Sequence, residues 1–531
     1  MAEKKRKIEA EAVRSVTERV LRWALLVIAF MALGLVLILN FLKTAEVSYD
    51  AYEKVSLHPK FPQALLLLLC SLAAVLLVSL LSRYVDRISV RYVFLGFVAV
   101  YALLALYLIL NVDGTIRADA WLTHDAALRV AEGDYSPLAT EGYIERYPHQ
   151  IGLMLYDTLI QLFTKNTEIY FVVNLLFVFG INAVFLAISH TLFESKLHDL
   201  VTVGLCFMFL PQFFFIMFAY GLIPGFFFMA LGFLGALRFT RTENWWYAAL
   251  TAIGCALAAT FKQNFLIGAI AVGIYLILDM LRRGTWKKRL KTLAALLITV
   301  TVLLLPTRII TGVYREISGE PIDQGTPTLT WVVMGTDIDN RYLGPGWYSG
   351  YNYSTYTNTG YKTEAAAEAA KEALRTNIEK IKAEPDRAAE FFLDKTYSQW
   401  CDPLFQSVWT GPLSHCNQKA HTELLTSLYD GGEVEDRVAT FARLILLSVL
   451  SFSLLALILR RTRTDGAEML VLFFIGGLLF HTVWEGKSQY TYPYVFVLIP
   501  LAAFGIVWLA RVYTRFIGWS NKKIKERISK K

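Results

Sequence analysis

The sequence is poor in charged residues. Asp, Glu, Lys and Arg make up only 18% of its 531 residues, whereas soluble proteins contain about 25%. Hydrophobic residues make up 55%. This composition excludes a disordered chain and a fibrous repeat, and it argues against an ordinary soluble enzyme.

Motifs of well-known chemistry are also missing. The sequence has no zinc-type cluster of His, Cys and Asp, no Walker loop, no Gly-x-Ser-x-Gly and no Gly-x-Gly-x-x-Gly at a strand–helix junction. Cysteines number only five. Of these, Cys401 and Cys416 lie in a long polar segment, where a disulfide is possible outside the cytoplasm. Two free thiols are the alternative.

What the sequence has instead is long apolar runs. A membrane-spanning helix needs about 20 mostly apolar residues. Twelve runs predict twelve spans: 22–42, 63–82, 92–111, 169–192, 200–217, 221–238, 246–261, 265–282, 290–307, 439–459, 467–484 and 492–511. The fold class is therefore predicted to be an all-α polytopic membrane protein.

Basic residues set the orientation of these spans. The net charge is +8, but Lys and Arg gather at the ends of apolar runs, which favours the positive-inside rule over nucleic-acid binding. Basic clusters at 83–91, 238–241, 282–291 and 460–463 all face the cytoplasm if both chain ends do. The protein is thus expected in the cytoplasmic membrane, with no nucleic-acid partner.

One apolar segment breaks this pattern. Residues 150–163 are only 14 long, and if they crossed the membrane every later basic loop would lie outside. They are better interpreted as an in-plane or re-entrant helix. Pro211, Gly221 and Pro224 interrupt the pair 200–217 and 221–238, and broken helices at membrane depth usually line a cavity.

Two large loops then lie outside. The second is acidic, because residues 311–437 contain 11 Lys and Arg against 19 Asp and Glu. The predicted plan is a cytoplasmic N-terminus (1–21), three spans (22–111), an outer loop (112–168), six spans (169–307), an extracytoplasmic α-rich domain (308–438), three spans (439–511) and a basic cytoplasmic tail (512–531).

Asp119 is the candidate catalytic residue of the first outer loop. The spacing of apolar residues predicts a helix over 119–132, so Asp119 begins a helix close to the membrane interface. Burial there can raise the pKa of a carboxyl and make it a useful base. The alternative is that Asp119 only caps the helix.

The loop resembles that of the GT-C superfamily of membrane glycosyltransferases. The family pattern has Asp-Glu at the loop start, an Ala-rich helix, Gly-Asp-aromatic and a Pro-containing motif before the next helix. The corresponding residues here are Asp119-Ala120, Ala126-Ala127, Gly133-Asp134-Tyr135 and Tyr147-Pro148-His149. The similarity is greatest to the protein O-mannosyltransferase-like and bacterial polyprenyl-phosphate-sugar-dependent members.

Two departures from the family matter. The family Asp normally follows the first span, whereas Asp119 follows the third. Its acidic neighbour is replaced by Ala120, so a second carboxylate must come from elsewhere or be absent.

The resemblance implies an inverting transfer of a sugar from a polyprenyl-phosphate-linked donor to a hydroxyl of an envelope glycan, lipid or protein. It implies a GT-C-like bundle, with Asp119 as general base and basic residues around the donor phosphate. A divalent metal is possible, and no other cofactor is expected. The candidate phosphate ligands are Lys262, Arg308, Lys487 and Tyr490, and the candidate supporting residues are Asp125, Glu145, His149, Gln150, Gln263 and Glu485.

Lys262 and Lys487 lie on short outer links, against the positive-inside rule, and the alternative for each is snorkelling to lipid head groups. Rival functions are a transporter or flippase of lipid-linked saccharides and a glycan polymerase or ligase. Spans nearly free of charge, and the absence of visible repeats, disfavour a transporter. In the second outer loop, aromatic residues such as Trp331 and Tyr348 suit sugars or simple packing, and helices are expected over 363–383 and from 385 to 400.

The topology gives the first testable prediction. Single cysteines introduced at positions 196 and 286 should both react only from the cytoplasmic side. Labelling of either one by an impermeant thiol reagent in intact cells would contradict the orientation.

Overall fold

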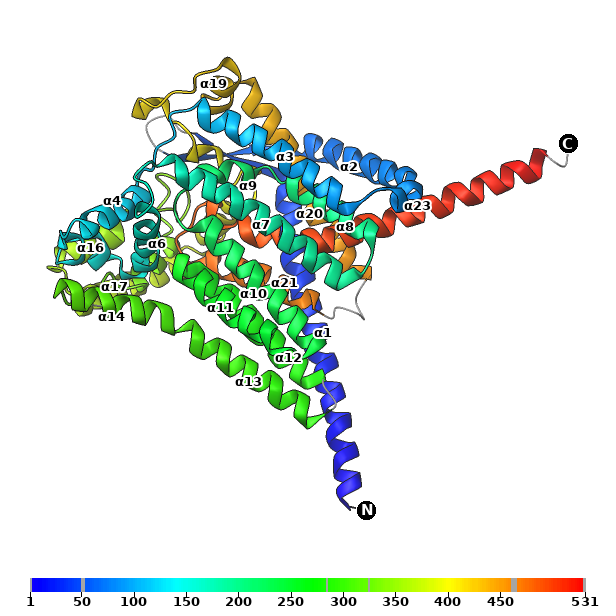
Figure 1. The fold of residues 1–531 in the computed structure, drawn as a ribbon, viewed down its shortest axis with the longest axis horizontal. Helices are drawn as coiled ribbons and strands as arrows, with labels where there is room; N and C mark the ends of the chain where they lie inside the picture. The colour runs from blue at the N-terminus through cyan, green and yellow to red at the C-terminus, as the bar shows by residue number, and fades with distance from the viewer. Residues whose placement is uncertain (1, 49–52, 283–284, 323–324, 460–465, 529–531) are drawn as a thin grey trace.

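The chain folds almost entirely into helices. The computed structural model describes residues 2–48, 53–282, 285–322, 325–459 and 466–528. Within these ranges the only strands form one two-stranded hairpin (Figure 1). Arg283 and the basic cluster 460–463 used in the orientation argument lie outside them.

The long apolar helices make this a multi-pass membrane protein. In the described ranges, nine helical segments are long and apolar enough to cross a membrane, and a tenth candidate is a pair bent by 53°. Two further apolar helices have 17 residues each. Every predicted run coincides with one of these segments, while the total of twelve spans stays a prediction.

The helices of these segments are α1 (Ala2–Leu42), α2 (Phe61–Leu81), α3 (Val90–Leu110), α7 (Glu168–Phe193), α8 (Lys196–Met208), α9 (Pro211–Phe214), α10 (Leu222–Thr242), α11 (Trp245–Phe261), α12 (Leu266–Arg282), α13 (Trp286–Leu303), α14 (Leu305–Ser318), α20 (Glu433–Leu459), α21 (Ala467–Val483), α22 (Tyr492–Phe496) and α23 (Ile499–Ile528). The others are α4 (Asp119–Ala131), α5 (Tyr143–Arg146), α6 (Ile151–Gln161), α15 (Leu329–Thr336), α16 (Tyr351–Asn358), α17 (Thr363–Ala383), α18 (Pro385–Trp400) and α19 (Glu423–Tyr429).

The loops with basic residues gather at one end of the bundle. Lys196 donates a hydrogen bond to the carbonyl of Asp86 at 2.9 Å, and Lys288 pairs with Glu243 at 2.9 Å. The helices α4, α6, α16 and α17, which belong to the two large loops, lie away from both chain ends (Figure 1). The molecule therefore has a basic end and an opposite end that carries the helices of these loops.

Helix α6 is too short to cross a membrane. Its 11 residues span about 16 Å at 1.5 Å per residue, against about 30 Å of hydrocarbon. Leu159, Leu162 and Phe163 at its end are exposed. These apolar side chains fit the in-plane position that was predicted for 150–163.

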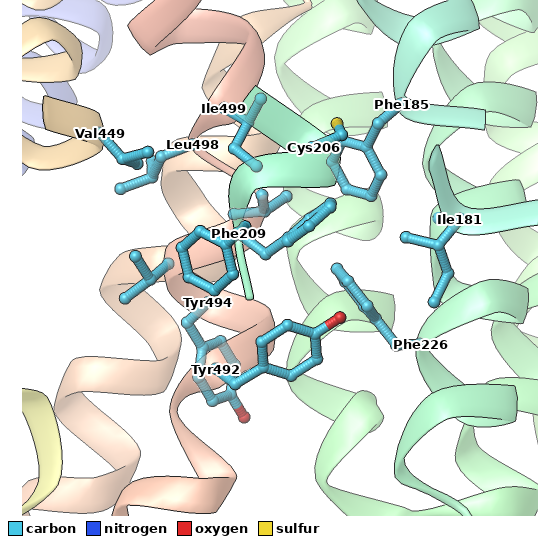
Figure 2. Close-up of a cluster of buried hydrophobic side chains, with 14 of the residues drawn as sticks. Ile181, Phe185, Cys206, Phe209, Phe226, Val449, Tyr492, Tyr494, Leu498 and Ile499 are labelled. Atoms are coloured by element: carbon cyan, nitrogen blue, oxygen red, sulfur yellow. The ribbon is translucent and has the colours of Figure 1, made fainter. Parts of the chain in front are cut away.

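A large aromatic cluster fills the centre of the bundle. Figure 2 shows Tyr492, Phe226 and Phe209 turned toward one another from α22, α10 and the end of α8. The Phe226 and Tyr492 rings are 5.5 Å apart and meet edge to face, an arrangement that aromatic pairs prefer. This cluster fixes the start of α22, which lies next to the site described below.

The hairpin was not predicted from the sequence. Strands β1 (Lys43–Ser48) and β2 (Lys54–Pro59) pair antiparallel and follow the end of α1. The N–H of Ala45 donates to the carbonyl of Cys401 and that of Val55 to the carbonyl of Leu343, each at 2.9 Å. The hairpin is thus fixed to the segment between α14 and α20.

Two features of this segment bear on the sequence expectations. Helix α14 continues through position 308, where the outer domain is expected to begin, because Pro306 in its first turn is compatible with a helix start. Cys401 and Cys416 are both free thiols, which is the alternative to a disulfide that the sequence leaves open. Cys401 is buried beside Leu39 and Tyr397, whereas Cys416 is exposed.

The predictions for α17 and α18 are confirmed. A buried lysine fastens α18 to the bundle: the ammonium of Lys395 donates to the carbonyls of Gly335 at 2.6 Å, Thr482 at 3.0 Å and Trp484 at 2.9 Å. Three acceptors match the three N–H groups of an ammonium. Gly335 is required here, because a Cβ would lie 2.4 Å from backbone atoms of Val483 and Trp484.

Replacing Lys395 tests this attachment. Lys395→Met keeps the apolar stem but leaves three buried carbonyls without a donor, which costs about 3 kcal/mol at roughly 1 kcal/mol per bond. We expect a lower melting temperature of the protein in detergent. Lys382→Met, at an exposed position on α17, is the control, and equal melting of the two variants would contradict this role.

Candidate functional site

The main cavity lies at the end of the bundle opposite the basic loops. Its volume is about 340 Å³. The walls come from the start of α4, the link between α11 and α12, the link between α21 and α22, helix α15 and the hairpin. Three carboxylates, two lysines and a set of aromatic rings face it.

Asp119 points its carboxylate into this cavity. It is the first residue of α4, whose N-cap is Ala118. Its carboxylate accepts a hydrogen bond from the hydroxyl of Tyr220 at 3.5 Å, and Gln150 donates in turn to that hydroxyl at 2.6 Å. Asp119 therefore begins the helix but does not occupy its N-cap position.

The surroundings of Asp119 make its carboxylate more basic. Loss of hydration within the cavity raises the pKa of the carboxyl, and Lys487 and Lys262 oppose this rise in pKa. The preceding residue, Ala118, has φ 53° and ψ −139°, a conformation that is unfavourable for a residue with a Cβ. Such strain is typical of positions where function fixes a side chain's direction.

Glu485 supplies the second carboxylate that Ala120 cannot. Its side chain is 4% exposed and borders the same cavity as Asp119. Its backbone N–H donates to the carbonyl of Trp331 at 3.0 Å, which ties the α21–α22 link to α15. Burial raises the pKa of Glu485 to about 7, against the pull of Lys487 and Lys395.

The two lysines of the cavity have different surroundings. The Lys262 ammonium lies 4.4 Å from the centre of the Tyr220 ring and 5.2 Å from that of Tyr490. Burial lowers the pKa of Lys262 to about 8, although Asp119 and Glu485 raise it. Lys487, by contrast, forms an ion pair with Glu53, a residue of the hairpin.

Aromatic side chains form one wall. The rings of Trp331 and Trp484 stack with centres 6.3 Å apart, and Tyr147 and His149 each meet Trp331 edge to face, at 6.1 and 6.0 Å. Burial lowers the pKa of His149 to about 4, so it is neutral near pH 7. Such a wall offers ring faces and polar edges to a sugar.

A second, smaller cavity of about 80 Å³ adjoins the first. Met217 to Tyr220, at the break between α9 and α10, border it, which confirms that the interrupted helices line a cavity. Asp119 and Lys487 border both cavities, as does Trp409. Arg117 holds Trp409 in place, with its guanidinium 4.7 Å from the ring centre. Asp119 thus borders both cavities.

Most of the residues predicted for the site do line the main cavity: Asp119, His149, Gln150, Lys262, Gln263, Glu485, Lys487 and Tyr490. Three do not. Arg308 lies exposed on α14, Asp125 pairs with Arg129 at 4.0 Å on the outer face of α4, and Glu145 is buried and accepts a hydrogen bond from Tyr356 at 2.5 Å. The cavity residues that the sequence did not indicate include Glu53, Tyr220 and Trp409.

The described residues contain no group of three or more His, Cys, Asp or Glu side chains that could hold a metal ion. The cavity is lined by carboxylates, lysines and aromatic rings. Groups of these types can transfer a proton and bind an anion.

The fold and site define a multi-pass helical membrane protein with a charged, aromatic-walled cavity at one end. No protein-family model matches the chain, and no curated protein matches it. The resemblance to the GT-C superfamily therefore rests on the sequence motifs and the arrangement of apolar runs.

The raised pKa of Glu485 is directly testable. Because this pKa is about 7, the carboxyl takes up a proton as the pH falls from 8 to 6, far above the usual range for glutamate. Infrared difference spectra of the purified protein should show carboxylic-acid absorption that Glu485→Gln weakens, while Asp402, whose pKa burial raises to about 6, contributes to the remaining absorption. Glu379→Gln, at an exposed position on α17, should keep the full absorption, and an unchanged spectrum for Glu485→Gln would contradict the assignment.

Proposed function

We propose that the protein is an integral-membrane glycosyltransferase. It transfers a sugar from a polyprenyl-phosphate-linked donor to an acceptor hydroxyl on the extracytoplasmic face of the cytoplasmic membrane. The observation that carries this proposal is the Asp119 carboxylate, which accepts a hydrogen bond from Tyr220 and borders a cavity that Lys262 and Lys487 also border. The basic loops at the opposite end support the orientation, through the positive-inside rule.

Asp119 is the general base of this reaction. The acceptor oxygen forms a bond to C1 of the sugar, the bond from C1 to the phosphate oxygen breaks with its electrons going to the phosphate, and the acceptor proton moves to Asp119. This single displacement inverts the configuration at C1. A carboxyl whose pKa is raised by burial is a stronger base than an ordinary aspartate.

Lys262 and Lys487 stabilise the leaving phosphate. Negative charge develops on the phosphate oxygen as the bond to C1 breaks, and ammonium groups held in a cavity of low dielectric bind that charge more strongly than water does. The Tyr490 ring beside Lys262 helps to keep this ammonium in place. Arg308 has no part in the proposal, because it borders neither cavity.

The two cavities suit two substrates. The larger one has the aromatic wall for a sugar, and the smaller one shares Ala118 and Asp119 with it. A base that borders both cavities can reach an acceptor in one and the reacting carbon in the other. A flippase of lipid-linked saccharides needs the same lipid and sugar contacts but no base, so loss of the base separates the two functions.

Asp119→Asn tests the proposal. The amide keeps the size and a partner for Tyr220 but cannot take a proton, so transfer should fall by roughly 10²–10⁴-fold, as for other lost general bases. Envelope glycans, lipids and proteins are compared by mass spectrometry in cells that lack the gene and in cells complemented with wild type or the variant. The sugar present with wild type should be missing with Asp119→Asn.

Asp125→Asn is the matched control. It lies on the same helix but outside both cavities and should restore the sugar as wild type does. A wild-type level of transfer by Asp119→Asn would refute the glycosyltransferase mechanism. That result would favour a flippase, which does not need the base.

A further inference from the structure

The hairpin places a carboxylate where the donor phosphate is expected to bind. We propose that Glu53 is an internal counter-ion that competes with the lipid phosphate for Lys487 and so promotes release of the phosphate product. This inference rests on the proposed function. It assigns a role in product release to a residue that takes no part in bond formation.

The contacts of Glu53 are specific. Its carboxylate pairs with the ammonium of Lys487, and the two side chains are only 10% and 15% exposed. Both border the main cavity. The Lys487 ammonium also lies 5.8 Å from the centre of the Trp409 ring, which borders both cavities. The ion pair therefore lies at the part of the main cavity that borders the smaller cavity, where the reaction is proposed to occur.

The hairpin holds Glu53 rigidly. Glu53 directly precedes β2, whose second residue, Val55, donates to the carbonyl of Leu343. Gly344 packs so closely on Val55 that a Cβ there would lie 2.7 Å from the valine side chain. Neither strand can shift far without breaking these contacts, so the carboxylate of Glu53 stays within reach of Lys487 after a ligand leaves.

A buried ion pair such as that of Glu53 and Lys487 costs free energy, and its presence therefore indicates a function. Removing two charges from water costs several kcal/mol per ion, which their attraction only partly offsets. In a phosphate site the pair also neutralises one of the two cavity lysines. Lys262 has aromatic neighbours and no ion-pair partner among the described residues, so it remains available to an anion while Lys487 is shared.

The charges of donor and product explain the function of this ion pair. A polyprenyl-phosphate-linked sugar is a phosphodiester with one negative charge. After transfer the lipid phosphate is a monoester with a second pKa of about 6, so near pH 7 its charge approaches −2. Without Glu53, the two lysines would bind this product more tightly than the donor. Glu53 offsets that preference by returning to Lys487 as the product leaves.

Glu53→Gln tests the competition. Farnesyl phosphate, a short dianionic monoester, is titrated into the purified full-length protein in detergent, and tryptophan fluorescence is followed because Trp331, Trp409 and Trp484 line the cavity. Glu53→Gln should bind farnesyl phosphate roughly tenfold more tightly than wild type, which corresponds to about 1.4 kcal/mol. The gain should be smaller for the methyl ester of farnesyl phosphate, which carries one charge.

Glu46→Gln is the matched control, because Glu46 lies on the same hairpin, is half exposed and pairs with Lys60 and His58 instead. It should bind farnesyl phosphate as wild type does. Glu53→Thr replaces Glu53→Gln if the amide variant does not purify as a single species. Unchanged or weaker binding by the Glu53 variant overturns the counter-ion role, whereas no saturable binding by any variant, wild type included, rejects the donor site itself.

Discussion

Charge compensation within one cavity is the constraint on which the rest of the structure depends. Asp119, Glu485 and Glu53 face the same space as Lys262 and Lys487, and an uncompensated charge in such surroundings costs several kcal/mol. The five groups come from four separate parts of the chain: the hairpin, the start of α4, the α11–α12 link and the α21–α22 link. These parts must meet for any of the charges to be tolerated, so the cavity and the fold around it form together.

Buried hydrogen bonds outside the cavity keep these groups in position. The link that carries Glu485 and Lys487 is held on one side by Lys395, which donates to the carbonyl of Trp484 at 2.9 Å. On the other side Ser488 donates to the carboxylate of Asp402 at 2.7 Å, and Asp402 also accepts from the N–H of Gln406 at 2.7 Å. Lys487 is thus fixed between two buried anchors, and a preorganised ammonium needs little rearrangement to stabilise developing charge.

Local signals in the sequence predicted local features well. The helices over 363–383 and 385–400, and the helix that begins at Asp119, follow from alanine-rich periodicity, proline and the end of a polar turn, all of which act within a few residues.

Lys262 and Lys487 could be found because they violate a charge rule. Glu53 could not, because its role depends on strand pairing and on contacts across hundreds of residues. Arg308 was misplaced for a related reason: its position depends on how far α14 continues beyond Pro306. Cysteine spacing could not decide between a disulfide and two free thiols, because the burial of Cys401 against α1 depends on contacts far apart in the sequence.

The most direct test of the central claim is an electron cryo-microscopy structure of the full-length protein in lipid nanodiscs with undecaprenyl phosphate. The account predicts phosphate density between Lys262 and Lys487, with ammonium-to-oxygen distances of about 2.7–2.9 Å, and the Glu53 carboxylate separated from Lys487. Phosphate density elsewhere on the protein, with the ion pair of Glu53 and Lys487 intact, would contradict it.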